Sequence, residues 1–137
     1  MTFEGFLKKY AGMKVDADKM YGAQCVDLFR QYCTDVWNVP HTGSVEGAKD
    51  LYLNYDKLPL EKKYFSLDAA KNAVQGDVVI WGATDKNKYG HVAIYVCNIG
   101  DSLLVFEQDG FKQDGAKFSL RSKENVLGII RKKKVLI

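Results

Sequence analysis

The sequence predicts an α+β domain in which N-terminal helices pack on an antiparallel sheet of about five strands. Between Thr2 and Leu53, apolar residues recur at the spacing of one helix face. From Tyr64 onward, short apolar runs are separated by turn residues, which is typical of strands. No linker, repeat or shift in composition divides the 137 residues, so we expect a single domain over residues 1–137.

The first part of the chain is expected to form helices. The first helix begins after Thr2, which can cap it, and ends near Gly12. The second begins at Cys25. Its core-facing positions are Cys25, Phe29, Tyr32, Cys33 and Val36. A third, short helix runs from Ser44 to about Leu53, after a break at Pro40.

The expected strands follow one another along the second part of the chain. The segment His91–Cys97 is apolar on both faces, as a central strand is. Gly100 and Asp101 form a turn that leads from it to the next strand. The five strands are Asp77–Trp81, His91–Cys97, Leu103–Asp109, Ala116–Leu120 and Val126–Arg131.

Composition and charge exclude several classes of protein. The formal net charge of +3 is far below that of a typical nucleic-acid binder. The N-terminus lacks the apolar region of a signal peptide, and no apolar run approaches membrane-spanning length. Three cysteines do not make a disulfide framework, and Cys33 and Cys97 are predicted to be buried as small apolar residues. We expect a monomer that neither binds nucleic acid nor inserts into a membrane.

Cys25 is a candidate nucleophile because the positive end of a helix dipole favours a thiolate. Such a thiol needs a base, and the chain has two histidines. His41 follows a proline in a loop and is interpreted as a surface residue. His91 opens the most apolar strand and can be aimed as a general base. The alternative is a strand-end histidine with a structural role only.

A carboxylate partner for His91 is predicted on the next strand. Strand alternation places Glu107 and Asp109 on one face with two apolar residues of the same strand. Carboxylates on a core-facing stripe need a partner. If this strand pairs with that of His91, Glu107 can accept the imidazole N–H, which gives a Cys–His–Glu triad.

The segment before Cys25 has a calcium-binding pattern. With Asp16 as position 1, Asp18 is position 3 and Asp27 is position 12 of an EF-hand-like frame. The carbonyl groups of Met20 and Gly22 can complete a set of hard oxygen ligands. The match is partial, because position 6 lacks the usual glycine and position 12 is not Glu. The alternative is a solvated acidic loop.

Four motifs together resemble the CHAP domain, the cysteine- and histidine-dependent amidohydrolase/peptidase family of bacterial and phage wall-degrading enzymes. They are Tyr21–Asp27 (YGAQCVD), Gly76–Trp81 (GDVVIW), Gly90–Ile94 (GHVAI) and Phe106–Asp109 (FEQD). The motifs follow the family's order and cover most of the chain.

The resemblance implies a papain-like fold with Cys25 as nucleophile, His91 as base and Glu107 as the orienting carboxylate. Asp109 stands where the family often has Asn, which leaves open whether Glu107 or Asp109 orients His91. Gln24 is implied to form the oxyanion hole with the backbone N–H of Cys25.

The resemblance also implies a substrate and a metal. Some phage members bind calcium in a DxDx(6–8)CxD-like loop, which Asp16, Asp18 and Asp27 match, so a structural calcium ion is expected. The implied reaction is cleavage of an amide in the peptide part of peptidoglycan, by an amidase or an endopeptidase. The protein would be made in a host cytoplasm without a signal peptide and reach the wall through a holin, alone or as part of a longer endolysin.

Three alternatives remain open. A binding module with a decayed active site would keep the fold without needing the triad. A thiol peptidase or acyltransferase would use the same triad on a non-wall amide, because a triad specifies chemistry and not substrate. A thiol–metal protein is disfavoured by the lack of CxxC spacing.

Overall fold

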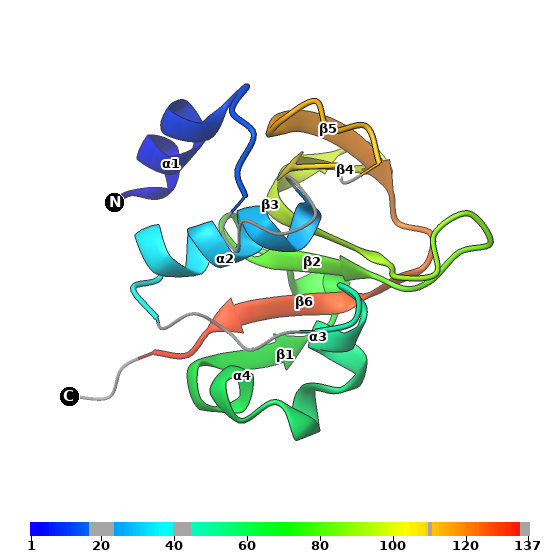
Figure 1. The fold of residues 1–137 in the computed structure, drawn as a ribbon. Helices are drawn as coiled ribbons and strands as arrows, with labels where there is room; N and C mark the ends of the chain where they lie inside the picture. The colour runs from blue at the N-terminus through cyan, green and yellow to red at the C-terminus, as the bar shows by residue number, and fades with distance from the viewer. Residues whose placement is uncertain (17–23, 40–44, 110, 135–137) are drawn as a thin grey trace.

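The computed structural model describes residues 1–16, 24–39, 45–109 and 111–134. These residues confirm the α+β class: helices come first and a six-stranded antiparallel sheet follows (Figure 1). The helices are α1 (Phe3–Tyr10), α2 (Cys25–Asp35), α3 (Asp50–Leu53) and α4 (Pro59–Tyr64), with short 3₁₀ turns at Tyr55–Lys57 and Ala70–Asn72. The strands are β1 (Phe65–Asp68), β2 (Val78–Trp81), β3 (His91–Ile99), β4 (Ser102–Glu107), β5 (Lys117–Ser122) and β6 (Val126–Lys132).

The strands are ordered β1-β6-β2-β3-β4-β5, so β2 and β3 lie at the centre and β5 at one edge. Helix α2 lies across one face of the sheet, and α3 and α4 lie near β1 (Figure 1). β3, predicted to be a central strand, is buried from Val92 to Tyr95, and its neighbour β2 is buried along its whole length. This order brings the ends of β3, β4 and β5 side by side, and the site described below lies there.

The main core lies between the helices and the sheet. Thr2 caps α1 as predicted, because its Oγ1 accepts the Gly5 N–H at 3.0 Å. The middle of the predicted apolar stripe, Phe29, Tyr32 and Cys33, is buried against the sheet, while its ends at Cys25 and Val36 are partly buried. The largest fully buried side chains of this layer are Phe6, Leu28, Phe29, Tyr32, Leu51, Phe65, Ile80, Ile94, Phe106 and Ile130. A smaller core covers the other face of the sheet, around Val79, Ala93, Tyr95, Val105 and Ile129.

Several expected boundaries are wrong. The strand β1 was not predicted, because its four residues are too few to show alternation; it pairs with β6. The third helix begins at Asp50, because residues 46–49 of the expected helix form bends and turns, while Ser44 lies outside the described residues. β4 ends at Glu107, two residues before Asp109, so the expected strand is too long at the end that carries the acids.

The prediction that Cys97 is buried is also wrong. A bulge in the pairing of β3 with β4, between Tyr95 and Cys97, shifts the register of the strand. Beyond the bulge β3 runs past the core, and Cys97 is exposed. A bulge of this kind depends on the partner strand, so the apolar pattern of β3 alone does not reveal it.

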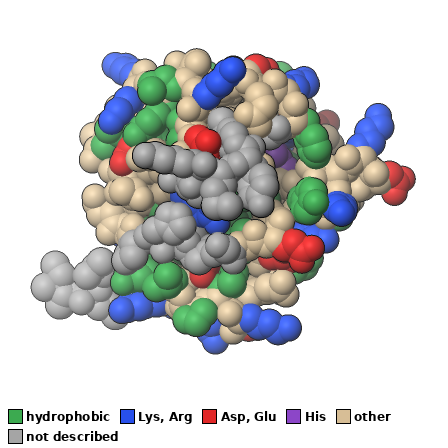
Figure 2. All heavy atoms as spheres, in the orientation of Figure 1, with side chains coloured by type: hydrophobic (Ala, Val, Ile, Leu, Met, Phe, Trp, Pro, Cys, Tyr) green, Lys and Arg blue, Asp and Glu red, His purple; other side chains and the backbone are tan. Residues whose placement is uncertain are grey.

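Among the described residues, charged side chains of both signs are scattered over the visible part of the face that α2 covers (Figure 2). Among the residues that the structure describes, none of the helices has the length and apolar character of a membrane-spanning segment.

Candidate active site

His91 is the first residue of β3 and pairs with Trp81 of β2. The preceding Gly90 has φ +75°, and a Cβ atom there would lie only 2.4 Å from the Trp81 carbonyl oxygen. Only glycine combines this backbone conformation with so close an approach. Asn87 Nδ2 donates to the Gly90 carbonyl at 2.8 Å, which anchors the loop before the histidine. The backbone thus fixes the direction of the imidazole, whose ring lies 5.6 Å from that of Trp81.

Glu107 ends β4, the strand beside β3, and points its carboxylate at the histidine. The distance from His91 Nε2 to Glu107 Oε1 is 3.0 Å, and Glu107 is 1% exposed. Arg121, on the edge strand β5, contacts the same carboxylate: Nε lies 2.5 Å from Oε1 and Nη2 lies 2.7 Å from Oε2. Glu107 is therefore shared between an imidazole and a guanidinium.

The two cationic partners keep Glu107 ionised. Burial alone would raise the pKa of Glu107, but hydrogen bonds from His91 and Arg121 outweigh it and lower the pKa to about 2. Burial likewise acts to lower the pKa of His91, but hydrogen bonding to Cys25 and Glu107 outweighs it and raises the pKa to about 9. His91 thus lies between a thiol and a carboxylate.

Cys25 is the first residue of α2, half-buried and a free thiol. α2 packs on β3, and this packing brings the start of the helix to the start of the strand. An ionised carboxylate can only accept hydrogen bonds, so Nε2 of His91 must carry the proton in its contact with Glu107. Nδ1 is then the ring nitrogen available to Cys25. The structure brings together the three residues predicted to form the triad.

A buried amide that the sequence analysis missed holds the segment before the cysteine. Gln108 is 0% exposed and follows Glu107 directly. Its Oε1 accepts the Val15 N–H at 2.7 Å, and its Nε2 donates to the carbonyls of Val15 at 2.7 Å and Gln24 at 2.8 Å. One side chain thus joins both ends of the segment that leads to Cys25. Its signal in the sequence was an amide next to a core strand, since a buried amide must find partners.

Asp109 is not placed as predicted. Because β4 ends at Glu107, Asp109 does not continue the strand face, and its Oδ1 accepts the backbone N–H groups of Phe111 at 2.8 Å and Lys112 at 3.4 Å. This is a turn-forming role that Asp often has. Among the described residues, the carboxylate hydrogen-bonded to His91 is that of Glu107.

Gln24 and Asp27 form the start of α2. The backbone N–H of Gln24 donates to Asp27 Oδ2 at 2.9 Å, which caps the first turn of the helix. The Gln24 carbonyl is held by Gln108, so the backbone just before Cys25 is tied down from two directions. The role of Gln24 in an oxyanion hole stays a prediction.

The predicted calcium ligands are only partly described. Asp18, Met20 and Gly22 lie outside the described residues. Asp16 is half-buried, and its buried Oδ1 has no hydrogen-bond partner among the described residues. No cluster of three or more candidate ligand side chains occurs in the described ranges. The Asp16 oxygen fits a hard cation, because a buried carboxylate oxygen needs a donor or a metal.

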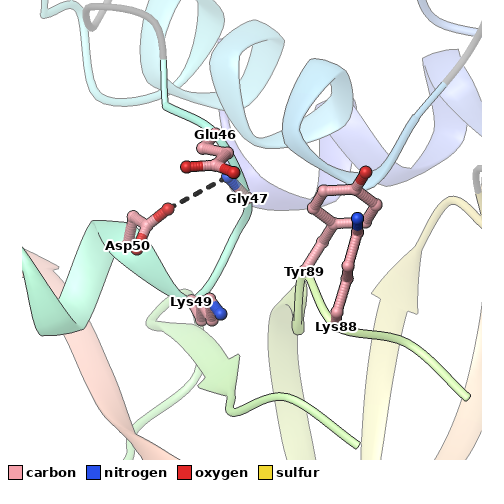
Figure 3. Close-up of a pocket in the computed structure, with 6 residues that line it drawn as sticks. All are labelled: Glu46, Gly47, Lys49, Asp50, Lys88 and Tyr89. Atoms are coloured by element: carbon pink, nitrogen blue, oxygen red, sulfur yellow. Dashed lines mark hydrogen bonds between the residues drawn. The ribbon is translucent and has the colours of Figure 1, made fainter. Parts of the chain in front are cut away.

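A cavity of about 270 Å³ opens beside His91. Its walls include Trp81, Asn87, His91, Arg121 and Glu124. A smaller cavity of about 160 Å³ lies between the segment before α3 and the loop from β2 to β3 (Figure 3). There the Lys49 N–H donates to the Tyr89 carbonyl at 3.0 Å, and the Gly47 N–H donates to Asp50 Oδ2 at 3.1 Å. The smaller cavity therefore lies where the segment before α3 contacts and supports the loop before His91.

In the papain-like class, a helix places a cysteine next to a histidine on the adjacent sheet. A third side chain forms a hydrogen bond with the histidine and orients it. Residues 14–109 match the sequence profile of the CHAP domain, more than half of the chain. The chain therefore belongs to the CHAP domain family.

Solved structures agree with this fold. The wild-type endolysin LysIME-EF1 superposes with a TM-score of 0.65 at 21% identity, covering 93% of this chain and 61% of that one. Ly7917 gives a TM-score of 0.62, and Ly7917 with the hydrolyzing product of MDP gives 0.61, both at 21% identity, 93% coverage of this chain and 60% of that one. At this identity the likeness shows a common fold, and the chain spans about three fifths of the length of these proteins. Comparison with curated protein sequences finds no match.

Proposed function

We propose that this protein is a thiol-dependent peptidoglycan hydrolase of the endolysin type, which cleaves an amide in the peptide part of the bacterial cell wall. The observation that carries the proposal is His91, whose Nε2 lies 3.0 Å from a buried carboxylate and whose pKa is raised by Cys25 as well as by Glu107. Membership of the CHAP domain family and the likeness to endolysin folds support the choice of substrate.

In the proposed mechanism, Glu107 holds the Nε2–H of His91 and leaves Nδ1 to take the proton of Cys25. The thiolate attacks the amide carbonyl carbon, and the backbone N–H of Cys25, with the side chain of Gln24, stabilises the oxyanion. As the C–N bond breaks, the imidazolium returns its proton to the leaving amine. A water molecule, deprotonated by His91, then hydrolyses the thioester and releases the acid and the free thiol.

We propose a structural calcium ion in the segment before Cys25. The carboxylates of Asp16, Asp18 and Asp27 and the carbonyls of Met20 and Gly22 would hold it. The ion would supply positive charge that neutralises these acids and fixes the loop leading to the nucleophile. It has no part in the acyl transfer.

The protein would work as a monomer on peptidoglycan, without a nucleic-acid partner, and would leave the host cytoplasm through a holin. Nothing in the triad separates a cut between muramic acid and L-alanine from a cut within the stem or cross-bridge, because the same acyl transfer serves both.

The test is digestion of purified Gram-positive cell walls, with calcium and then with EDTA, followed by mass spectrometry of the fragments. We expect new amine and carboxyl ends whose identity names the bond, and we expect the Cys25→Ser protein to release none while it melts like the parent. No fragments from folded, calcium-loaded protein on several wall types would favour a decayed binding module or a thiol enzyme with a non-wall substrate. Equal activity in the Cys25→Ser protein would remove Cys25 as the nucleophile.

A further inference from the structure

The carboxylate of Glu107 has two cationic partners, and only His91 has a place in the proposed mechanism. We propose that Arg121 is a positioning residue of the active site: it binds Glu107 through two hydrogen bonds and so sets how firmly His91 holds its proton. The inference rests on the proposed function for its effect on activity, but its effect on His91 can be measured without a substrate.

The geometry of the contact fixes the plane of the carboxylate. Arg121 Nε reaches Oε1 at 2.5 Å and Nη2 reaches Oε2 at 2.7 Å, so both oxygens are held by one planar group. A paired contact of this kind is more directional than a single hydrogen bond. Rotation of the Glu107 carboxylate away from His91 would break both hydrogen bonds to the guanidinium. Oε1 therefore stays aimed at His91 Nε2.

The burial of Glu107 makes a second cation necessary. Glu107 is 1% exposed, and an uncompensated buried charge is strongly destabilising. His91 alternates between its neutral and protonated forms in the proposed reaction, so it cannot compensate the carboxylate throughout. Arg121 is always charged. It therefore keeps Glu107 ionised at the stages where His91 is neutral.

The charge of Arg121 also acts on His91. The titratable groups around the imidazole are Cys25 on α2, Glu107 on β4 and Arg121 on β5, with Asp109, Lys117 and Glu124 nearby. Because Arg121 shares the negative charge of Glu107 and repels an imidazolium, it limits the stabilisation of protonated His91. Without Arg121, His91 would hold its proton more tightly and would donate it less readily to the leaving amine.

The strand offers a matched control. Lys117 lies on the same face of β5 as Arg121 and directly opposite Glu107 in the sheet register, yet its Nζ pairs with Asp114 at 2.7 Å. Arg121 lies opposite Leu103 and reaches Glu107 along the strand. Lys117→Gln therefore removes a charge of the same sign from the same face and leaves the contact with Glu107 in place.

The experiment is NMR titration of the His91 ring in a Cys25→Ser background, which removes the coupled titration of thiol and imidazole. His41→Gln identifies the second histidine signal. In the Arg121→Gln protein we expect the His91 midpoint to rise by about one pH unit, in Arg121→Lys by less, and in Lys117→Gln hardly at all. An unchanged or lowered midpoint in Arg121→Gln, or an equal rise in Lys117→Gln, would overturn the inference.

Activity on cell walls is measured in parallel, with Cys25 restored. We expect Arg121→Gln to lose about 10- to 100-fold in the rate of fragment release, Arg121→Lys to recover part of it, and Lys117→Gln to keep it. Arg121 is partly exposed, and a melting curve verifies that each variant is folded. If no variant or parent cleaves walls, the proposed function fails, while the NMR titration still decides the coupling of Arg121 to His91.

Discussion

The two sides of the candidate active site are held by different forces. On the strand side, His91, Glu107 and Arg121 occupy neighbouring strands and are joined by charged hydrogen bonds. On the loop side, Cys25 follows a segment whose two ends are tied by the neutral amide of Gln108. The strand side is therefore expected to respond to pH and charge. The loop side is expected to respond to packing and, where calcium binds, to the metal.

The largest expected effect comes from exchanging the carboxylate on the strand side. Glu107→Gln removes the ionised partner of His91 and leaves the Arg121 guanidinium without its counter-charge, so wall cleavage should fall on the order of 10³-fold. Asp109→Asn should change the rate less than about threefold, because an amide oxygen can still accept the N–H of Phe111. Rates of fragment release from cell walls, measured side by side, compare the two. A larger loss of rate in Asp109→Asn than in Glu107→Gln would show that Asp109 orients His91.

A smaller effect is expected from the loop side. Gln108→Met is similar in volume but removes three hydrogen bonds, two of which satisfy the N–H and the carbonyl of the buried Val15. We expect the free energy of unfolding in urea to fall by about 3 kcal/mol. We also expect the rate of wall cleavage by the folded protein to fall about tenfold or more, because Cys25 is less well placed.

Two controls keep this prediction specific to the loop. Gln75→Met, at an exposed position, should change neither property. The NMR midpoint of His91 should also stay the same in Gln108→Met, because the contacts of His91 with Glu107 and Arg121 do not pass through the amide. Full activity with reduced stability would show that Gln108 serves packing alone.

The contrast also explains how far the sequence could predict the site. His91 and Glu107 were predictable because each follows from a local pattern, an apolar strand and a strand alternation. Arg121 was not, because its contact depends on the register of β4 with β5 and spans residues that do not face each other. Asp109 was misplaced because the end of a strand is set by its partner, and the alternation alone does not show where pairing stops.

The parts of the fold that were not predicted also depend on contacts between strands. β1 is a short edge strand whose identity depends on β6, which lies far along the chain. The exposure of Cys97 depends on a bulge in its pairing with β4. Gln108 falls between these cases, because its position beside a core strand marked it as an amide in need of partners, but the partners lie on a distant loop.

The smallest expected effect tests whether calcium completes the loop side. If calcium binds the folded protein, it should raise the melting temperature of the parent by about 10 °C, since a ligand at about 100 times its Kd adds about 2.7 kcal/mol. Asp16→Asn should abolish the gain, because it removes the charge of a carboxylate whose buried oxygen lacks a partner among the described residues. Asp101→Asn, in an exposed turn, should keep it.

During the calcium titration, the melting temperature and the NMR midpoint of His91 are both measured. The two readouts distinguish an effect on the loop side from an effect on the strand side. A gain in stability without a shift of the His91 midpoint would place the ion on the loop side, away from the charges of Glu107 and Arg121. A gain that persists in Asp16→Asn would assign the ion to other residues, and no gain in the parent would dismiss the calcium proposal. In that last case calcium would add nothing to the contacts of Gln108 with the segment before Cys25, and the effect of Gln108→Met should then be the same with calcium and with EDTA.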